Sequence, residues 1–274
     1  MNITEIIKRR YSCRTYIQTA LKPADKENLE RFIIENCKGL DDETVNFRII
    51  EKNDSEKQLK LNYGMIQGHN TYVLGTSRSS PDSRVNYGYL LEKVVLKATE
   101  TGISTCWIGY FDYGFFNEIS VEAGFEIPAL VIAGYSEEKQ PYLDKFVRFA
   151  INATKRTGWD KLFFDYKLRT PLNREQVKKY SDSLEMVRLA PSSGNTQPWR
   201  VFFDETENEF HFFKKPISKR YESRGLHDVD MGIALAHFEL MALQNELSGR
   251  WLKHADGIVK SMDDLQYIRT WKCC

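Results

Sequence analysis

The sequence is poor in cysteine, and the few cysteines that it has follow no recognised pattern. They are Cys13, Cys37, Cys106, Cys273 and Cys274, an odd number with no pair in Cys-x-x-Cys spacing. This arrangement favours neither a disulfide framework nor a cysteine-ligated metal site. We therefore expect the protein to reside in a reducing compartment, the cytoplasm.

Long apolar runs and an excess of charge of one sign are also missing. No apolar run approaches the roughly 20 residues that cross a bilayer, and the N-terminus lacks the apolar stretch of a signal peptide. The 39 basic and 38 acidic residues leave a net charge of +1. No global field favours nucleic acid or a membrane as a partner, so any anion must be recognised locally. His227, His237 and His254 are scattered and interpreted as structural or surface residues, and no metal site is expected.

What the sequence does contain is ample material for a core, with 42% hydrophobic and 13% aromatic residues in 274. This length suits one large domain or two small ones. Strand-like runs alternate with helical patterns, which predicts an α+β fold. The strands are expected at 72–75, 104–110, 129–135 and 210–213, and helices at 1–10 and 115–124, the latter stopped by Gly124.

The chain also resembles itself. Residues 85–92 and 229–236 match at an offset of 144 positions, and both begin buried, helix-patterned segments. A weaker echo relates 28–32, before a strand-like 45–50, to 183–187, before 199–203. Chance similarity of two amphipathic helices is the alternative, but the shared order of elements favours an internal duplication, a pseudo-dimer within one chain. The matched pairs are Val85 and Val229, Gly88 and Gly232, Leu91 and Leu235, Leu96 and Leu240, Ala98 and Ala242, Ser104 and Ser248, and Trp107 and Trp251.

Four segments contain residues suited to binding. In the first, Arg10, Ser12 and Arg14 alternate onto one side if the chain is extended, which would form a phosphate receptor. In the second, 189–200, Gly194 and Asn195 suit unusual backbone angles among many polar side chains. Taken alone, the first is more simply a solvated basic turn and the second an ordinary polar loop.

The third segment is 101–110, where Gly102 fits a helix C-cap and Gly109 allows a ligand to approach the backbone. A buried strand explains it equally well, and Cys106 is interpreted as an inert core thiol. The fourth, 152–159, has a basic pair ahead of a turn and means little alone.

Together the segments resemble the nitroreductase family of FMN oxidoreductases. Three motifs support the resemblance: Arg-Arg-x-Ser-x-Arg at 9–14, Ala-Pro-Ser-Ser-Gly-Asn-x-Gln-Pro-Trp-Arg at 190–200, and Gly-Ile-Ser-Thr-Cys-Trp-Ile-Gly at 102–109. The second motif lies far downstream of its usual place, which here holds Glu35–Leu40. This matches a branch in which one chain resembles a fused nitroreductase dimer, with a first half at 1–157 and a truncated second half at 158–274.

The resemblance implies an α/β sandwich with FMN between the halves. Phosphate contacts would come from Arg10 and Ser12, helped by Lys155 or Arg156, while Arg14 would lie near the pyrimidine edge. Residues Gln67–His69 align loosely with a region that contacts the ring edge. The full set of expected cofactor contacts is Arg10, Tyr11, Ser12, Arg14, Ile108, Gly109, Tyr110, Lys155, Arg156, Pro191, Ser192, Ser193 and Asn195.

The twin site is expected not to bind flavin. Residues 154–159 lack the Arg-x-Ser-x-Arg pattern, and the first half lacks the Ser-Ser-Gly-Asn loop, so one FMN per monomeric chain is predicted. The resemblance implies ping-pong transfer from NADH or NADPH through flavin N5 to a small-molecule acceptor such as a nitroaromatic or quinone. No catalytic side chain is nominated. Alternatives are a non-catalytic flavin-binding or storage protein, or dehalogenation or flavin breakdown on the same fold.

Overall fold

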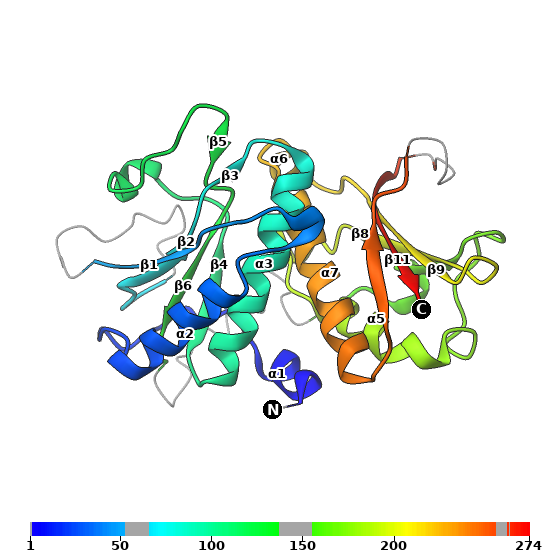
Figure 1. Cartoon of the computed structure of the whole chain (residues 1–274), viewed down its shortest axis with the longest axis horizontal. Coiled ribbons are helices and arrows are strands. Elements are labelled where there is room, and N and C mark those ends of the chain that lie inside the picture. The colour runs from blue at the N-terminus through cyan, green and yellow to red at the C-terminus, as the bar shows by residue number, and fades with distance from the viewer. Residues whose placement is uncertain (1, 53–65, 137–154, 256–261, 263) are drawn as a thin grey trace.

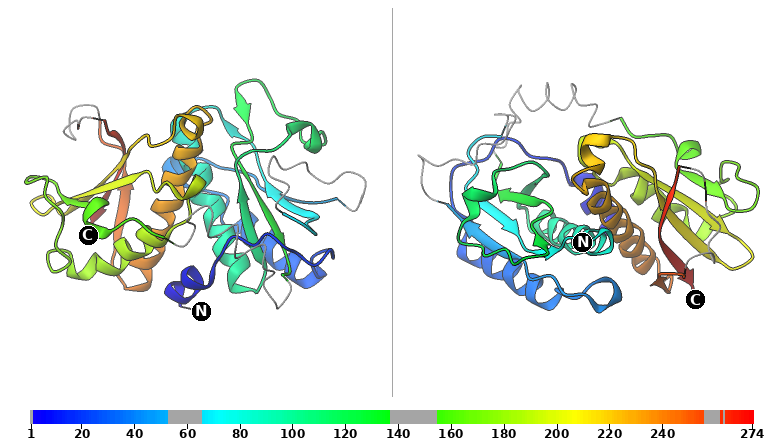
Figure 2. Two further views of the ribbon diagram at one scale, coloured as in Figure 1. Left: turned by 180° about the vertical axis from the view of Figure 1, so that it is seen from behind. Right: turned by 90° about the horizontal axis from the view of Figure 1, so that it is seen from above.

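Two central helices lie between two β-sheets in the computed structural model (Figures 1 and 2). The structure describes residues 2–52, 66–136, 155–255, 262 and 264–274. Within these ranges no helix combines the length and the apolar character that crossing a bilayer requires. The central helices are α3 (Pro81–Glu100) and α7 (Leu226–Gln244), and most of their residues are buried.

The ends of α3 follow directly from its sequence. Ser80 caps the N-terminus by accepting a hydrogen bond from the Ser83 N–H, and proline occupies the first turn, where its missing N–H is harmless. At the other end Gly102 has a φ of +85°, and the Ile103 N–H donates to the Ala98 carbonyl oxygen at 2.8 Å. This is a Schellman motif, so the predicted glycine cap is confirmed.

The first sheet is antiparallel and has the order β1-β2-β6-β4. The helix α2 (Pro23–Glu35) packs beside α3. The strands are β1 (Arg48–Glu51), β2 (Thr71–Leu74), β4 (Ser104–Ile108) and β6 (Leu130–Gly134).

The second sheet has the order β10-β11-β9-β8-β7. The helix α5 (Ser181–Leu189) packs beside α7. All neighbours are antiparallel except β7 and β8, which run parallel. The strands are β7 (Phe163–Asp165), β8 (Trp199–Asp204), β9 (Glu209–Lys214), β10 (Gly249–Leu252) and β11 (Gln266–Cys273).

The two halves repeat the same series of elements. Along the chain, α2-β1-β2-α3-β4-β6 is followed by α5-β8-β9-α7-β10-β11, and the corresponding strands take the same order in each sheet. The matched tryptophans also make the same kind of hydrogen bond, from the indole N–H to a glutamate of a central helix. Trp107 donates to Glu92 of α3 at 2.8 Å, and Trp251 donates to Glu239 of α7 at 3.2 Å. Among the described strands, β7 has no counterpart beside β1.

The matched glycines hold the two central helices together. A Cβ on Gly88 would clash with the Val229 carbonyl oxygen, and a Cβ on Gly232 would clash with that of Val85. Val85 and Val229 are themselves a matched pair, so the crossing is reciprocal. Only glycine lets the two backbones approach this closely. This explains why both copies of the internal repeat have glycine at this position.

Two sequence expectations about elements need correction. The predicted helix at 115–124 is wrong: after a short 3-10 helix (Tyr113–Phe116) the chain makes turns, and Gly124 has a φ of +83°. Val121 is 41% exposed, so this stretch has too little apolar surface to bury against the core. The strand expected at 45–50 begins only at Arg48, because the Val45 N–H donates to the Cys37 carbonyl oxygen instead.

The remaining elements are short. They are α1 (Ile3–Arg9), α6 (Lys219–Glu222), β3 (Ser77–Arg78), β5 (Phe125–Glu126), and 3-10 turns at Leu40–Asp42, Trp159–Lys161, Lys178–Tyr180 and Ser193–Asn195.

Candidate functional site

The segment after α1 runs along the first sheet. The Cys13 N–H donates to the Thr105 carbonyl oxygen of β4 at 2.9 Å, and Ser12 forms a bridge with the same residue. Cys13 is fully buried, whereas Arg10, Ser12 and Arg14 are half-buried. Tyr11 and Cys13 share one apolar cluster, which agrees with an alternating chain, and the placement of Arg10, Ser12 and Arg14 on one opposite side stays a prediction.

Two contacts fix Arg14 and the residues beside it. Its guanidinium donates to the Ser12 carbonyl oxygen at 3.4 Å, and its own carbonyl accepts from the Gln67 N–H at 2.8 Å. Gln67 therefore does lie beside the motif. His69 is buried and contacts the Tyr72 hydroxyl at 2.8 Å. Tyr11 packs partly against the apolar cluster around Cys13.

The loop at 190–197 adopts the unusual backbone expected of it. Gly194 has a φ of +58°, Asn195 of +56° and Gln197 of +50°. The Gln197 N–H donates to the Ser192 hydroxyl at 2.9 Å, and the Gln197 side chain donates to the Arg188 carbonyl oxygen at 2.8 Å. The loop is thus held to α5 by its own polar side chains, and Pro191 is buried beneath it.

A buried carboxylate of α7 anchors this loop. The Ser193 N–H donates to Asp230 Oδ1 at 2.8 Å, and the Ser193 hydroxyl lies 3.2 Å from the same oxygen. Burial raises the pKa of Asp230 to about 8, against the lowering effect of the two Ser193 hydrogen bonds. Asp230 Oδ2 is buried and has no hydrogen-bond partner among the described residues. The hydroxyl of Ser193 is therefore directed to α7.

Arg156 joins the loop to the N-terminal motif. Its guanidinium donates to Asn195 Oδ1 and, at 3.0 Å, to the Leu189 carbonyl oxygen. Burial is the largest cause that lowers the pKa of Arg156 to about 10, and the positive charges of Arg10 and Arg188 contribute to the same lowering. The Arg156 guanidinium thus bonds to Asn195 and is within electrostatic reach of the Arg10 charge. Such a pair is stabilised by an anion between or beside the two groups.

Two neighbours of Arg156 also bind the loop. The Thr157 N–H donates to the Gln197 side chain at 2.7 Å, and the Asn195 side chain donates to the Lys155 carbonyl oxygen at 2.9 Å. The Lys155 side chain is exposed. Lys155, Arg156 and Thr157 therefore contact the 190–197 loop. Residues 154–159 are also the segment expected at the twin site, and Thr154 lies outside the described residues.

The end of β4 approaches the second half. Ile108 is buried, and the space beside Gly109 is taken by Leu226, whose Cδ1 would lie 2.7 Å from an added Cβ. The Tyr110 hydroxyl donates to the Arg220 carbonyl oxygen at 3.0 Å. The guanidinium carbons of Arg220 and Arg224 lie 4.4 and 4.7 Å from the Tyr110 ring centre.

Sequence reasoning missed the contribution of α6. Tyr221 lies against the loop, since its hydroxyl would be 2.6 Å from a Cβ on Gly194, and its ring centre is 6.2 Å from that of Tyr110. It connects the loop with the end of β4. The run Lys219-Arg220-Tyr221 next to the second repeat helix was the available signal, but nothing local in it indicates which loops it meets.

The corresponding place in the first half has a different loop. The Leu40 N–H donates to Asn86 Oδ1 at 2.7 Å, and the Asn86 amide donates to the Glu43 carbonyl oxygen at 3.0 Å. The segment Glu35–Leu40 offers no Ser-Ser-Gly-Asn sequence. The two halves thus share a scaffold, and their loops differ in chemistry.

Comparison with known proteins agrees with this architecture. The family model described as "Putative TM nitroreductase" matches residues 2–242. A crystal structure of a putative nitroreductase from Thermotoga maritima has a TM-score of 0.62 at 21% identity, covering 100% of this chain and 93% of that chain. No curated protein matches.

Shorter solved chains resemble about half of this one. A nitroreductase family protein from Clostridium novyi NT has a TM-score of 0.41 at 19% identity, covering 53% of this chain and 92% of its own. A nitroreductase with bound FMN from Bacteroides fragilis has a TM-score of 0.41 at 17% identity, covering 52% and 91%.

Proposed function

The chain belongs to the family described as "Putative TM nitroreductase" and has the nitroreductase fold, and from this we propose that it is an FMN-dependent oxidoreductase with one flavin site. The site would lie where the Arg10–Arg14 segment of the first half meets the 190–197 loop of the second. The observation that most supports the proposal is the bonding of Arg156 to Asn195 in this loop, within electrostatic reach of Arg10.

The donor set in this region suits FMN. A phosphate needs cationic and N–H or O–H donors, which Arg10, Ser12 and Arg156 supply. A bound dianion would oppose the lowering of the Arg156 pKa. The flavin ring needs apolar packing and backbone donors, and Ile108 to Tyr110 lie at the end of β4 next to α6. The residues present therefore fit the cofactor.

Each residue group then has a distinct task. Arg10 and Ser12 would bind the phosphate, with Arg156 contributing charge from the other side of the loop. Asn195 and the backbone of 192–195 would contact the polar edge of the ring, and Asp230 would hold that loop in place through Ser193. Arg14 would lie near the pyrimidine edge, where its charge favours the reduced ring.

When bound, FMN would supply the redox chemistry, accepting hydride from NADH or NADPH and passing electrons to an electron-poor small molecule. The chain would supply binding, orientation and local charge. No acid or base side chain is assigned to the reaction. The chain is proposed to act as a monomer, because the two halves already provide both sides of the site within one polypeptide.

Purification followed by anaerobic addition of NADH and of NADPH tests this proposal. We expect a yellow protein whose absorbance near the flavin maximum bleaches rapidly with at least one donor. A yellow protein that neither donor reduces would contradict the reductase and favour a flavin-binding or storage role, or another flavin chemistry. A colourless protein that does not take up added FMN would contradict the flavin site itself.

A further inference from the structure

A second cluster of binding side chains lies on the outer face of the second sheet. Glu209 and His211 are two residues apart on β9 and therefore point to the same face. Between and after them, Phe210 and Phe212 pack on Phe238 of α7 with ring centres 5.2 and 5.4 Å apart. The glutamate and histidine thus face away from the central helices.

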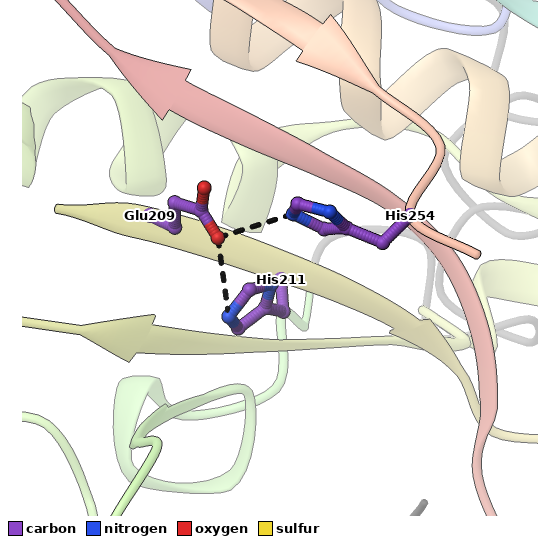
Figure 3. A group of neighbouring side chains, drawn as sticks. All are labelled: Glu209, His211 and His254. Carbon is purple, nitrogen blue, oxygen red and sulfur yellow. Dashed lines mark hydrogen bonds and ion pairs between the residues drawn. The ribbon is translucent and has the colours of Figure 1, made fainter. Parts of the chain in front are cut away.

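His254, which follows β10, completes the cluster (Figure 3). Its Nε2 lies 3.2 Å from Glu209 Oε2, and His211 Nε2 lies 3.9 Å from the same oxygen. One atom of each residue lies within 4.8 Å of the others. Zinc binds nitrogen and carboxylate oxygen at about 2.0–2.2 Å, so tetrahedral ligands sit about 3.4 Å apart. The two separations from Glu209 Oε2 already lie within about 0.5 Å of that spacing.

A hydrogen bond accounts for only part of this geometry. The 3.2 Å contact suits an imidazole N–H donating to Glu209, but 3.9 Å is too long for a hydrogen bond from His211. Glu209 is 7% and His211 3% exposed, so a carboxylate and an imidazole have been buried side by side.

The surrounding residues orient the three groups in the way that metal ligands are oriented. His211 Nδ1 bonds to the Thr270 hydroxyl at 2.8 Å, and that hydroxyl bonds to Tyr267 at 2.8 Å. Lys272 Nζ lies 3.1 Å from Glu209 Oε1. Thr270 and Lys272 thus bind His211 Nδ1 and Glu209 Oε1. This leaves His211 Nε2 and Glu209 Oε2 directed toward His254.

We propose that Glu209, His211 and His254 bind one divalent metal ion of the zinc class and leave one coordination position open. Two imidazoles and a carboxylate are a common ligand set for such ions, and three protein ligands leave room for water or a small ligand. No local spacing in the sequence indicates this cluster, because His254 lies 43 positions beyond His211. The proposal departs from the expectation of no metal site.

The metal site is separate from the proposed flavin site. Glu209 begins β9, whereas Lys214 at the other end forms ion pairs with Glu222 of α6 and Asp228 of α7 at 2.7 and 2.6 Å. The flavin-site elements therefore adjoin the far end of the strand. The inference does not depend on the proposed function, and its test has no flavin readout.

Calorimetric titration of the chelator-treated full-length protein with Zn²⁺ tests the proposal. We expect one ion per chain, a rise in thermal midpoint on binding, and no comparable effect of Mg²⁺, which prefers oxygen ligands. His254→Gln, a change at a partly exposed side chain, should weaken binding at least tenfold. Glu209→Gln should do the same and serves as a second variant.

Two controls assign the site. Glu207→Gln removes a more exposed carboxylate two residues away and should leave Zn²⁺ affinity unchanged. Cys274→Ser removes the exposed thiol, the other group suited to zinc, and should also leave it unchanged. Absence of Zn²⁺ binding, or binding that survives His254→Gln and disappears in Cys274→Ser, would overturn the proposal.

Discussion

Asn86 of α3 and Asp230 of α7 occupy equivalent positions, 144 residues apart, and each accepts a backbone N–H from the loop beside it. Asn86 accepts from Leu40, and Asp230 accepts from Ser193, at 2.7 and 2.8 Å. The amide bears no charge, whereas the buried acid must either keep its proton or exist as a charged group without its hydration. The acid at position 230, in place of the amide at position 86, lies in the half whose loop is proposed to bind flavin.

The pKa of Asp230 predicts how stability changes with pH. Its folded value of about 8 lies above the ordinary value near 3.9, so the folded state binds more protons between those limits. The contribution of Asp230 to stability is therefore complete below about pH 4 and falls as the pH rises to 8. Asp230→Asn should remove this loss while its amide oxygen still accepts from Ser193. Chemical denaturation of the FMN-free protein should show the variant gaining about 3–4 kcal/mol over the native chain from pH 5 to pH 8.

Asp182→Asn, at an exposed position of α5, is the matched control and should show no such pH-dependent gain. An equal change in the free energy of unfolding at both pH values for Asp230→Asn would contradict the raised pKa.

The phosphate assignment predicts a selective loss of FMN affinity. Arg10→Ala should weaken FMN binding by about 1.5–3 kcal/mol, the contribution of a charge-assisted hydrogen bond. This corresponds to a loss of affinity of roughly tenfold to a hundredfold. The affinity for riboflavin, which has no phosphate, should change little. Fluorescence titration with both flavins measures the difference. Lys8→Ala removes an exposed positive charge from the same N-terminal segment and controls for net charge. Equal losses for the two flavins would contradict the assignment.

The placement of Arg14 predicts an effect on reduction rather than on binding. Removing its charge should make the bound flavin harder to reduce, because the cation favours the anionic reduced ring. Arg14→Gln should lower the midpoint potential by about 30 mV, which corresponds to about 1.4 kcal/mol for a two-electron couple. Potentiometric titration measures this shift, and Arg48→Gln, at an exposed position on β1, should leave the potential unchanged. A lowered FMN affinity with an unchanged potential would place Arg14 at the phosphate instead.

The crossing of the central helices predicts a large effect of one methyl group. Gly232→Ala should lower the free energy of unfolding by about 1–3 kcal/mol or more, because the new Cβ meets the Val85 carbonyl oxygen and backbone cannot yield easily. Gly114→Ala, where the nearest atom would lie 3.3 Å away on an exposed turn, should change it little. Urea denaturation measures both. Similarly small changes in the free energy of unfolding of the two variants would show that the central helices can move apart without a loss of stability.

Sequence alone predicted what is encoded by local spacing. The internal repeat could be predicted from Gly88 and Gly232, because the backbone contact allows only glycine at these positions. The alternation around Cys13 could be predicted because side chains of an extended chain alternate with a period of two. The approach of Tyr221 to Gly194 was not visible, since it depends on how α6 and the loop meet in space. The cluster at Glu209 and His254 was hidden for the same reason, because it forms only when β9 lies next to the chain that follows β10.

The predicted boundary between the halves at 157 and 158 remains a prediction. Arg156 and Thr157 contact the loop of the second half, and β7 adds to the second sheet without a counterpart in the described part of the first. These contacts tie the two halves together around the proposed site.

The number of flavins per chain tests the central claim most directly. FMN-saturated protein, freed of unbound flavin and analysed for flavin released on denaturation against chain concentration, should give one FMN per chain, and light scattering should give the mass of one chain. That result would agree with a working site at Arg10, Arg156 and Asn195 and a first-half loop at Glu35–Leu40 that does not bind. A value of two would show that the twin site also binds flavin, and a value of zero would contradict the flavin site.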